Sequence, residues 1–148
     1  MAIAEKRVFK FEKVYIKDAS LECPSVPEIF AAPEAQEVSV ECGVDHRPMA
    51  EGFYEVVLAV KVRAEKGERT CFAVEVHQGG VFQIRNAPDD DLLEFLEITC
   101  PDMLMGFARE LVCNLVIKAG FPQLVIDPVN FRALYEEKRT LLAQASRD

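Results

Sequence analysis

Few side chains in this 148-residue sequence belong to the types that perform catalysis or bind metal ions. There are two histidines, His46 and His77, and five cysteines at positions 23, 42, 71, 100 and 113, with no CxxC pair. Zinc sites need several such ligands at short, regular spacings, and no such spacing is present. P-loop, GxGxxG and GxSxG motifs are also missing, and Gly79-Gly80 alone does not indicate a phosphate-binding loop. The sequence therefore predicts no catalytic residue, no metal and no cofactor, and we expect a protein that is not an enzyme.

The cysteines nevertheless leave one alternative open, a small thiol or metal enzyme. Cys42, Cys71 and Cys113 fall within strand-like or helix-like patterns, where a cysteine behaves as a small buried apolar side chain. Cys23 and Cys100 each precede a proline, and nothing nearby marks either one as an activated thiolate. An odd number of scattered cysteines indicates a reducing compartment. With no secretory signal and no apolar run of about 20 residues, we expect a cytoplasmic protein that does not insert into the membrane.

The charge balance excludes another class of function. The chain has 25 acidic against 17 basic residues, a net charge of −8. A nucleic-acid or anionic-membrane binder needs a positive surface, so we expect neither partner. Half of the residues are apolar, which predicts a single folded domain over residues 1–148 with a sizeable core. We expect flexible ends at 1–7 and 144–148.

Acidic residues on strand-like segments are the first candidates for a binding surface. Glu75 lies among small and polar residues in one alternating segment, and Asp18 and Glu22 share a parity in another. Alternate residues of a strand point to opposite faces, so two such strands with aligned faces would gather the three carboxylates. The result would be an acidic patch flanked by apolar side chains. A solvated sheet face is the ordinary alternative.

Apolar residues on a crossover are the second candidate. Three prolines between positions 24 and 33 block helix and central strand alike, and the same stretch contains Ile29 and Phe30. Next to a strand that contains Val38 and Val40, this crossover would form one wall of an apolar groove. Filling of the core is the ordinary alternative.

An antiparallel sheet positions these candidates. Residues 53–63 and 71–77 alternate between apolar and polar side chains and are joined by a polar, glycine-containing turn at 65–68. This pattern predicts two half-buried strands in a hairpin. A further strand is predicted at 37–44, followed by a polar loop at 45–51.

The first strand is predicted at 8–22. Its alternation changes parity near Glu12-Lys13, which indicates a β-bulge. Beyond this bulge the strict alternation places Val14, Ile16 and Asp18 on one face.

The last third of the chain changes to helical periodicity. Asp89-Asp90-Asp91 precedes one helix, because acids favour a helix start, and Pro101 interrupts the pattern and opens a second helix. From 104 to 119 the apolar residues cover most of the circumference, so this helix must be buried on two sides, against the sheet and against another subunit. Gly120 ends it, and Asp127-Pro128 is predicted to cap a last amphipathic helix.

Five motifs give the sequence a family resemblance, and it is similar to the bacterial protein-export chaperone family SecB. The match runs in order from about Tyr15 to Tyr135. The motifs are PSVPEIF (24–30), FYEVVL (53–58), EVHQGGVF (75–82), CPDMLMGFARE (100–110) and GFPQLVIDPVNFRALY (120–135).

The resemblance implies an α+β fold, with a four-stranded antiparallel sheet and two C-terminal helices packed on one side. It implies a homotetramer, a dimer of dimers, in which Phe72, Val74, Val76, Gln78, Leu111 and Leu115 face helices and subunit contacts. Members hold unfolded precursor proteins without ATP and deliver them to the translocation motor SecA.

The resemblance also assigns binding residues. The basic zinc-binding tail of SecA would meet the sheet face at Asp18, Glu22, Ala73 and Glu75. Unfolded clients would occupy an apolar groove. Its expected residues are Phe30, Val38, Val40, Cys42, Leu134 and Tyr135.

One rival within the family remains, a SecB-like paralogue dedicated to another client, such as the antitoxin of a toxin–antitoxin pair. Ala73 stands where family members have a large apolar residue beside the acidic patch, and this favours the rival.

Overall fold

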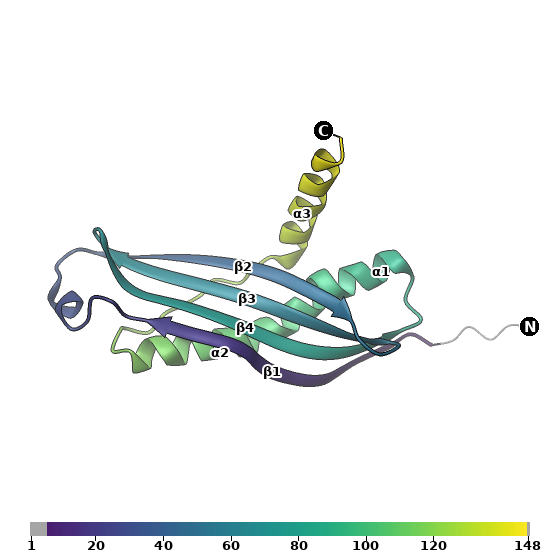
Figure 1. Ribbon diagram of the computed structural model, residues 1–148, viewed down its shortest axis with the longest axis horizontal. Helices are drawn as coiled ribbons and strands as arrows, with labels where there is room; N and C mark the ends of the chain where they lie inside the picture. The colour runs from purple at the N-terminus through teal and green to yellow at the C-terminus, as the bar shows by residue number, and fades with distance from the viewer. Residues whose placement is uncertain (1–5, 148) are drawn as a thin grey trace, which may run out of the picture.

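Four long strands form one antiparallel sheet in the computed structural model, which describes residues 6–147 (Figure 1). The order across the sheet is β1-β4-β3-β2, so the central hairpin is flanked by the two earlier strands. The predicted α+β class and four-stranded sheet are therefore confirmed. The strands are β1 (Val8–Glu22), β2 (Gln36–Pro48), β3 (Phe53–Lys66) and β4 (Arg69–Arg85).

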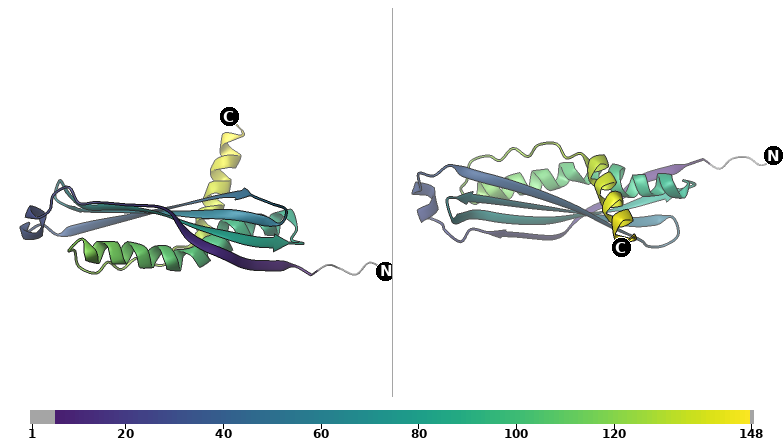
Figure 2. Two further views of the ribbon diagram at one scale, coloured as in Figure 1. Left: turned by 60° about the horizontal axis from the view of Figure 1, so that its bottom comes forward. Right: turned by 90° about the horizontal axis from the view of Figure 1, so that it is seen from above.

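The helical part follows the sheet in the sequence. A 3₁₀ turn, η1, lies on the proline-rich crossover, where no helix was expected. The long helix α2 crosses one face of the sheet, whereas α3 projects away from the sheet (Figures 1 and 2). The helical elements are η1 (Glu28–Ala31), α1 (Asp89–Glu94), the π-helical turn η2 (Phe95–Thr99), α2 (Cys100–Lys118) and α3 (Phe131–Ala145).

The sheet has a covered face and an open face. On the covered face, α2 lies mainly over β4 and β3. The apolar residues of the alternating pattern fill this layer, and Phe72 and Val76 of β4 are fully buried together with Leu104 of α2. A Cβ atom on Gly80 would lie 2.9 Å from Cδ2 of Leu104, so the missing side chain lets α2 approach the sheet closely.

A buried carboxylate ties three strands together on the open face. Glu55 of β3 is only 6% exposed. It accepts hydrogen bonds from the Tyr15 hydroxyl at 2.5 Å, from Lys17 Nζ at 2.8 Å and from Arg47 Nε at 2.9 Å. The Tyr15 ring passes over β4 at Gly79, in the space that a Cβ atom would need. We call Glu55 and its three donors, Tyr15, Lys17 and Arg47, the Glu55 network.

Strand β1 has two irregularities, of which only one was predicted from the sequence. The register shifts between Phe11 and Lys13, as expected, and again between Ile16 and Asp18. The second shift means that Val14 and Ile16 face α2, whereas Asp18 lies on the open face. The prediction that they share a face was wrong, because each bulge adds an unpaired residue and exchanges the two faces of the strand.

Two further boundaries differ from the predictions. Strand β2 continues to Pro48, so the stretch after position 44 is paired with β3 instead of forming a loop. Pro101 does not interrupt the helix, because η2 leads from α1 into α2 without a break. A π-helical turn changes the hydrogen-bond pattern locally, and this one ends at Thr99, two residues before the proline, which has no N–H to donate.

The ends of the chain are described only in part. The predicted flexible segments include residues 1–5 and 148, which lie outside the described residues. Arg7 forms an ion pair with Asp91 at 2.8 Å. At the other end, α3 extends through Ala145. In the part of the chain that the structure describes, no helix is long and apolar enough to span a membrane.

Candidate binding groove and acidic patch

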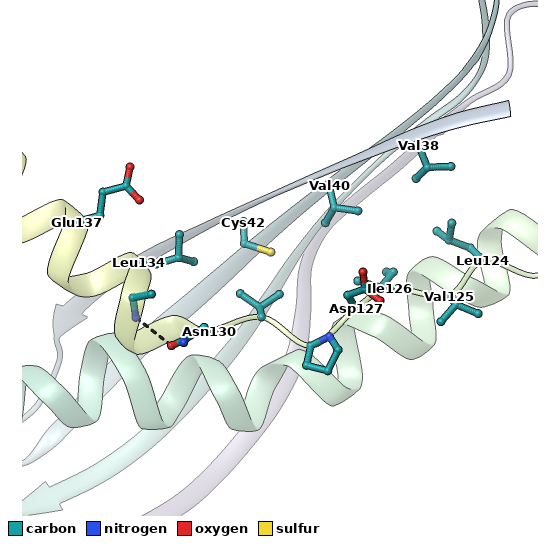
Figure 3. Close-up of a pocket in the computed structure, with 13 residues that line it drawn as sticks. Val38, Val40, Cys42, Leu124, Val125, Ile126, Asp127, Asn130, Leu134 and Glu137 are labelled. Carbon is teal, nitrogen blue, oxygen red and sulfur yellow. Dashed lines mark hydrogen bonds between the residues drawn. The ribbon is translucent and has the colours of Figure 1, made fainter.

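An apolar groove lies between β2 and the extended segment that joins α2 to α3 (Figure 3). The helix α2 lies over β3 and β4 but does not extend over the edge strand β2. The side chains of β2 on this face of the sheet are therefore accessible. Val38 and Val40 are 40% and 39% exposed there, and Val125 on the opposite wall is 80% exposed. The volume of this part of the groove is about 530 Å³.

A second part of the groove continues between β2 and α3. It contains Val44 of β2 and Tyr135 and Leu141 of α3, and its volume is about 640 Å³. The two parts share Cys42 and Leu134, so they form one continuous channel, which we call the β2 groove. Large exposed apolar surfaces of this kind mark sites where another molecule binds.

The sequence around residues 121–130 explains why this wall is extended. Pro122 and Pro128 prevent a continuous helix. Leu124 and Ile126 are buried and anchor the segment to the body, whereas Val125 between them faces outward. The Cys113 Sγ atom of α2 also donates a hydrogen bond to the carbonyl of Leu124 at 3.3 Å, which ties the segment to α2.

Five of the six predicted groove residues lie together. Val38, Val40, Cys42, Leu134 and Tyr135 all line the β2 groove. Phe30 does not. Its ring packs on Phe121 with the ring centroids 5.1 Å apart, away from both parts of the groove.

The wall formed by the extended segment between α2 and α3 was not predicted from the sequence. Leu124, Val125 and Ile126 belong to the wall opposite β2, with Val125 turned outward (Figure 3). The available signal was an apolar triplet between two prolines, which excludes a helix and favours an extended segment.

The start of α3 differs from the prediction as well. Asp127 does not cap the helix, and residues up to 130 are not helical. Asn130 is the N-cap, and its side chain accepts a hydrogen bond from the N–H of Ala133 at 3.0 Å. An N-cap side chain satisfies a donor that has no partner within the helix.

We expect Asn130→Ala to destabilise α3 by about 1 kcal/mol, because that donor loses its partner. Asp127→Ala should leave α3 unchanged. Hydrogen exchange of the α3 amides measures both effects. Equal acceleration of exchange by the two variants would contradict the assignment of the cap.

The predicted acidic residues lie on the open face of the sheet. Ser20 is opposite Glu75, Asp18 is opposite His77 and Glu22 is opposite Ala73. Directly opposed residues share a face, so Asp18, Glu22, Ala73 and Glu75 form one surface at the β1–β4 edge, which we call the acidic patch.

The surroundings of the acidic patch differ from the prediction. Lys61 of β3 lies opposite Glu75, and Arg63 lies opposite Ala73, so the patch borders basic residues instead of apolar ones. His77 Nε2 lies 3.1 Å from Glu75 Oε1. The hydrogen bond from His77, with the nearby charge of Lys61, lowers the pKa of the Glu75 carboxyl. Glu75 is therefore ionised at neutral pH.

The predicted subunit-contact residues fall into two groups. Phe72, Val74, Val76 and Gln78 are buried beneath α2 of the same chain. Leu111 and Leu115 are half-buried on α2 itself. Other apolar side chains of α2 are more exposed, among them Phe107 and Ile117 at 44% and 51%.

Four of the five cysteines have a thiol pKa that burial raises. Burial raises the pKa of Cys42, and it raises the pKa of Cys100 to about 12. A thiol with a raised pKa is a poor nucleophile at neutral pH. Among residues 6–147, no three His, Cys, Asp or Glu side chains gather in a way that could hold a metal ion.

The fold and the groove define a class of protein, an α+β domain with one covered sheet face and an open apolar binding groove. The family model described as "Preprotein translocase subunit SecB" matches residues 3–141. The chain belongs to the SecB family.

Two relatives support this assignment, and a solved structure supports the fold. A protein-export protein SecB of Methylobacillus flagellatus is 43% identical over 96% of this chain and 90% of its own. Another, of an Azoarcus species, is 47% identical over 89% and 88%. The SecB-like chaperone Rv1957 of Mycobacterium tuberculosis, solved in complex with a peptide of the HigA1 antitoxin, has a TM-score of 0.69. It covers 82% of this chain and 91% of its own at 11% identity, and so it supports the fold alone.

Proposed function

We propose that this protein is an ATP-independent cytoplasmic chaperone of protein export. It binds unfolded precursor proteins in the β2 groove and delivers them to SecA. The observation that carries the proposal is the continuous apolar groove, in a chain that belongs to the SecB family.

The groove suits an unfolded chain for a physical reason. Burial of apolar surface contributes roughly 25 cal/mol per Å², whatever the order of the apolar side chains in the client. The exposed valines of β2 and the leucines of α3 supply such surface along the whole channel. Affinity then comes from many weak contacts, so one groove accepts many sequences.

We further propose a homotetramer, a dimer of dimers. The outward side of α2 supports this, because Met103, Phe107 and Ile117 are each more than a third exposed. Apolar residues at this spacing on one helix form a stripe that a second copy would cover.

Calorimetric titration without nucleotide tests the chaperone function. A permanently unfolded precursor should bind with a negative change in heat capacity, since apolar surface is buried, and its folded form should not bind. Binding of both forms, or of neither, would contradict the proposal.

The acidic patch is the proposed docking site for the basic zinc-binding tail of SecA. We expect Glu75→Gln to weaken binding of this tail about tenfold at low ionic strength and to reduce its salt dependence, because opposite charges on two surfaces attract. The matched control is Glu37→Gln, because Glu37 lies on the same open face of the sheet but on β2, away from the acidic patch. Titrations at two salt concentrations measure both effects, and an equal loss in the control would argue against a local site.

A specialised paralogue is the second candidate function. Ala73 favours it, because this small side chain leaves the centre of the acidic patch without a large apolar contact for SecA. In that case the β2 groove would receive one dedicated client, such as an antitoxin. Failure of SecA tail binding together with intact binding of unfolded chains would favour this reading.

A further inference from the structure

A second buried carboxylate lies where β2, η2 and α3 meet. Glu97 is only 7% exposed. Its Oε1 atom lies 3.0 Å from Nε2 of His46 and 3.0 Å from Nζ of Lys138. Because a carboxylate only accepts hydrogen bonds, Nε2 of His46 carries the proton in this contact. We call these three residues the Glu97 clasp.

The hydrogen bonds of the clasp favour the ionised form of Glu97 more than burial disfavours it. Burial by itself raises the pKa of the Glu97 carboxyl, but the hydrogen bonds from His46 and Lys138 leave it below its ordinary value. Glu97 is therefore ionised at neutral pH. A buried, ionised carboxylate with charged donors forms stronger hydrogen bonds than neutral groups do.

Within residues 6–147, the clasp is one of few attachments of α3. The helix projects from the body and contacts it mainly at η2 (Figure 1). Phe131 is buried at its base, and the Arg132–Glu94 pair, at 3.5 Å, joins two exposed side chains. Lys138 follows Phe131 by seven residues, which is about 10 Å along a helix. Two anchors at this separation fix the direction of α3 as well as its position.

The same helix is a wall of the β2 groove. Leu134, Leu141 and Leu142 line the second part of the groove, and Lys138 lies on the helix face between them. His46 extends from β2, the opposite wall. The clasp thus connects the two walls through Glu97, and its contacts set the spacing between them.

We propose that Glu97, held by His46 and Lys138, is a positioning residue that fixes α3 as a wall of the β2 groove and thereby sets how long the groove retains an unfolded segment. This inference rests on the proposed chaperone function. With the clasp intact, the leucines of α3 stay within reach of a client. With the clasp broken, α3 pivots on its base and the groove widens.

Two variants break the clasp without removing apolar surface. Lys138→Met keeps the length of the side chain and suits a helix, and Glu97→Gln keeps the shape of the carboxylate. Lys138→Arg retains the charge and should restore the contact. Arg139→Met is the matched control, because it also removes a cation from α3. The described contact of Arg139 is with the ring of Tyr135 on its own helix.

Hydrogen exchange without any client tests the positioning directly. Loss of one charge-assisted hydrogen bond should accelerate exchange in the outer half of α3 about tenfold in Lys138→Met and Glu97→Gln. Exchange of the α2 amides should not change. A double variant that combines Lys138→Met with Glu97→Gln should exchange its α3 amides no faster than the faster of the two single variants. Unchanged exchange in α3, or equal acceleration in Arg139→Met, would overturn the proposal.

Client dissociation tests the consequence. The same two variants should release an unfolded precursor about three- to tenfold faster, and Lys138→Arg should release it at the wild-type rate. Faster exchange in α3 with an unchanged rate of client dissociation would overturn the proposed role of the clasp in retaining a client, and would leave the proposed chaperone function intact. A wild-type protein that binds no unfolded chain would instead overturn the proposed function, and the role of the clasp in binding with it.

Discussion

Replacing Glu55 by alanine is expected to lower the free energy of unfolding by about 3 kcal/mol at neutral pH. The hydrogen bond from Lys17, followed by that from Tyr15, lowers the pKa of Glu55 from its ordinary value of 4.5 to about 2. A lowered pKa means that the folded state stabilises the ionised form. Loss of the carboxylate also leaves the Tyr15 hydroxyl without its acceptor.

The pH dependence distinguishes this effect from ordinary loss of packing. Because the folded-state pKa of Glu55 is lowered, its contribution is fully present above pH 4.5 and is lost as the pH falls toward 2. The difference between wild type and Glu55→Ala should therefore shrink over this range. Urea unfolding of both proteins at several pH values and one protein concentration measures this difference in the free energy of unfolding.

A matched control is Glu65→Ala, which removes an exposed carboxylate from the same strand. Glu65 is paired with Arg63 at 2.7 Å, and both side chains are about half exposed. Exposed pairs of this kind contribute about 0–1 kcal/mol. Equal destabilisation by the two substitutions would show that the Glu55 network has no special role.

Replacing Val38 by aspartate is expected to weaken binding of an unfolded precursor about a hundredfold. Val38 lies in the β2 groove opposite Leu124 and Val125 (Figure 3). A bound client would bury the new carboxylate among apolar side chains, and burial of an unpaired charge is costly. Free protein should fold normally, because Val38 is already 40% exposed.

The neighbouring residue provides the control. Ser39 is on the same strand but on the open face, so Ser39→Asp adds the same charge outside the groove. Titration with the unfolded chain should show wild-type affinity for Ser39→Asp. Similar losses in the two variants would mean that net charge, and not the groove, controls binding.

The central part of the fold could be predicted from the sequence. In the middle of β3 and β4 the period of two is uninterrupted, and the predicted inward residues from Val56 to Val62 and from Phe72 to Val76 are buried. The last two motifs of the family resemblance are long, so they identified the family even though no residue type revealed a chemical function. The prediction of the family is confirmed by the family model.

The faces of β1 could be predicted only in part. The parity change near Glu12 is visible because apolar residues lie on both sides of it. The shift at Lys17 was missed although it leaves a similar signal, since the apolar residues Val14 and Ile16 precede it at even positions and Ala19 and Leu21 follow it at odd positions. Asp18 and Glu22 nevertheless lie on the same face as Glu75, because both follow the shift and share a parity.

The walls of the β2 groove depended on contacts that no local pattern contains. His46 was predicted to lie in a polar loop, but pairing with β3 extends β2 and brings His46 to Glu97. The direction of α3 likewise depends on Lys138 and Glu97, which are 41 residues apart. Periodicity describes neighbours in sequence and cannot report such pairs.

The second bulge lets β1 lose one residue without changing the faces of the strand. Deletion of Lys17 would place Asp18 directly after Ile16, and ordinary alternation would keep Ile16 toward α2 and Asp18 on the open face. Leu21 would still point toward the core, and Glu22 would stay in the acidic patch. The deletion would instead remove the Lys17 donor from Glu55, so a single-residue gap at this position would alter the Glu55 network and leave the acidic patch in place.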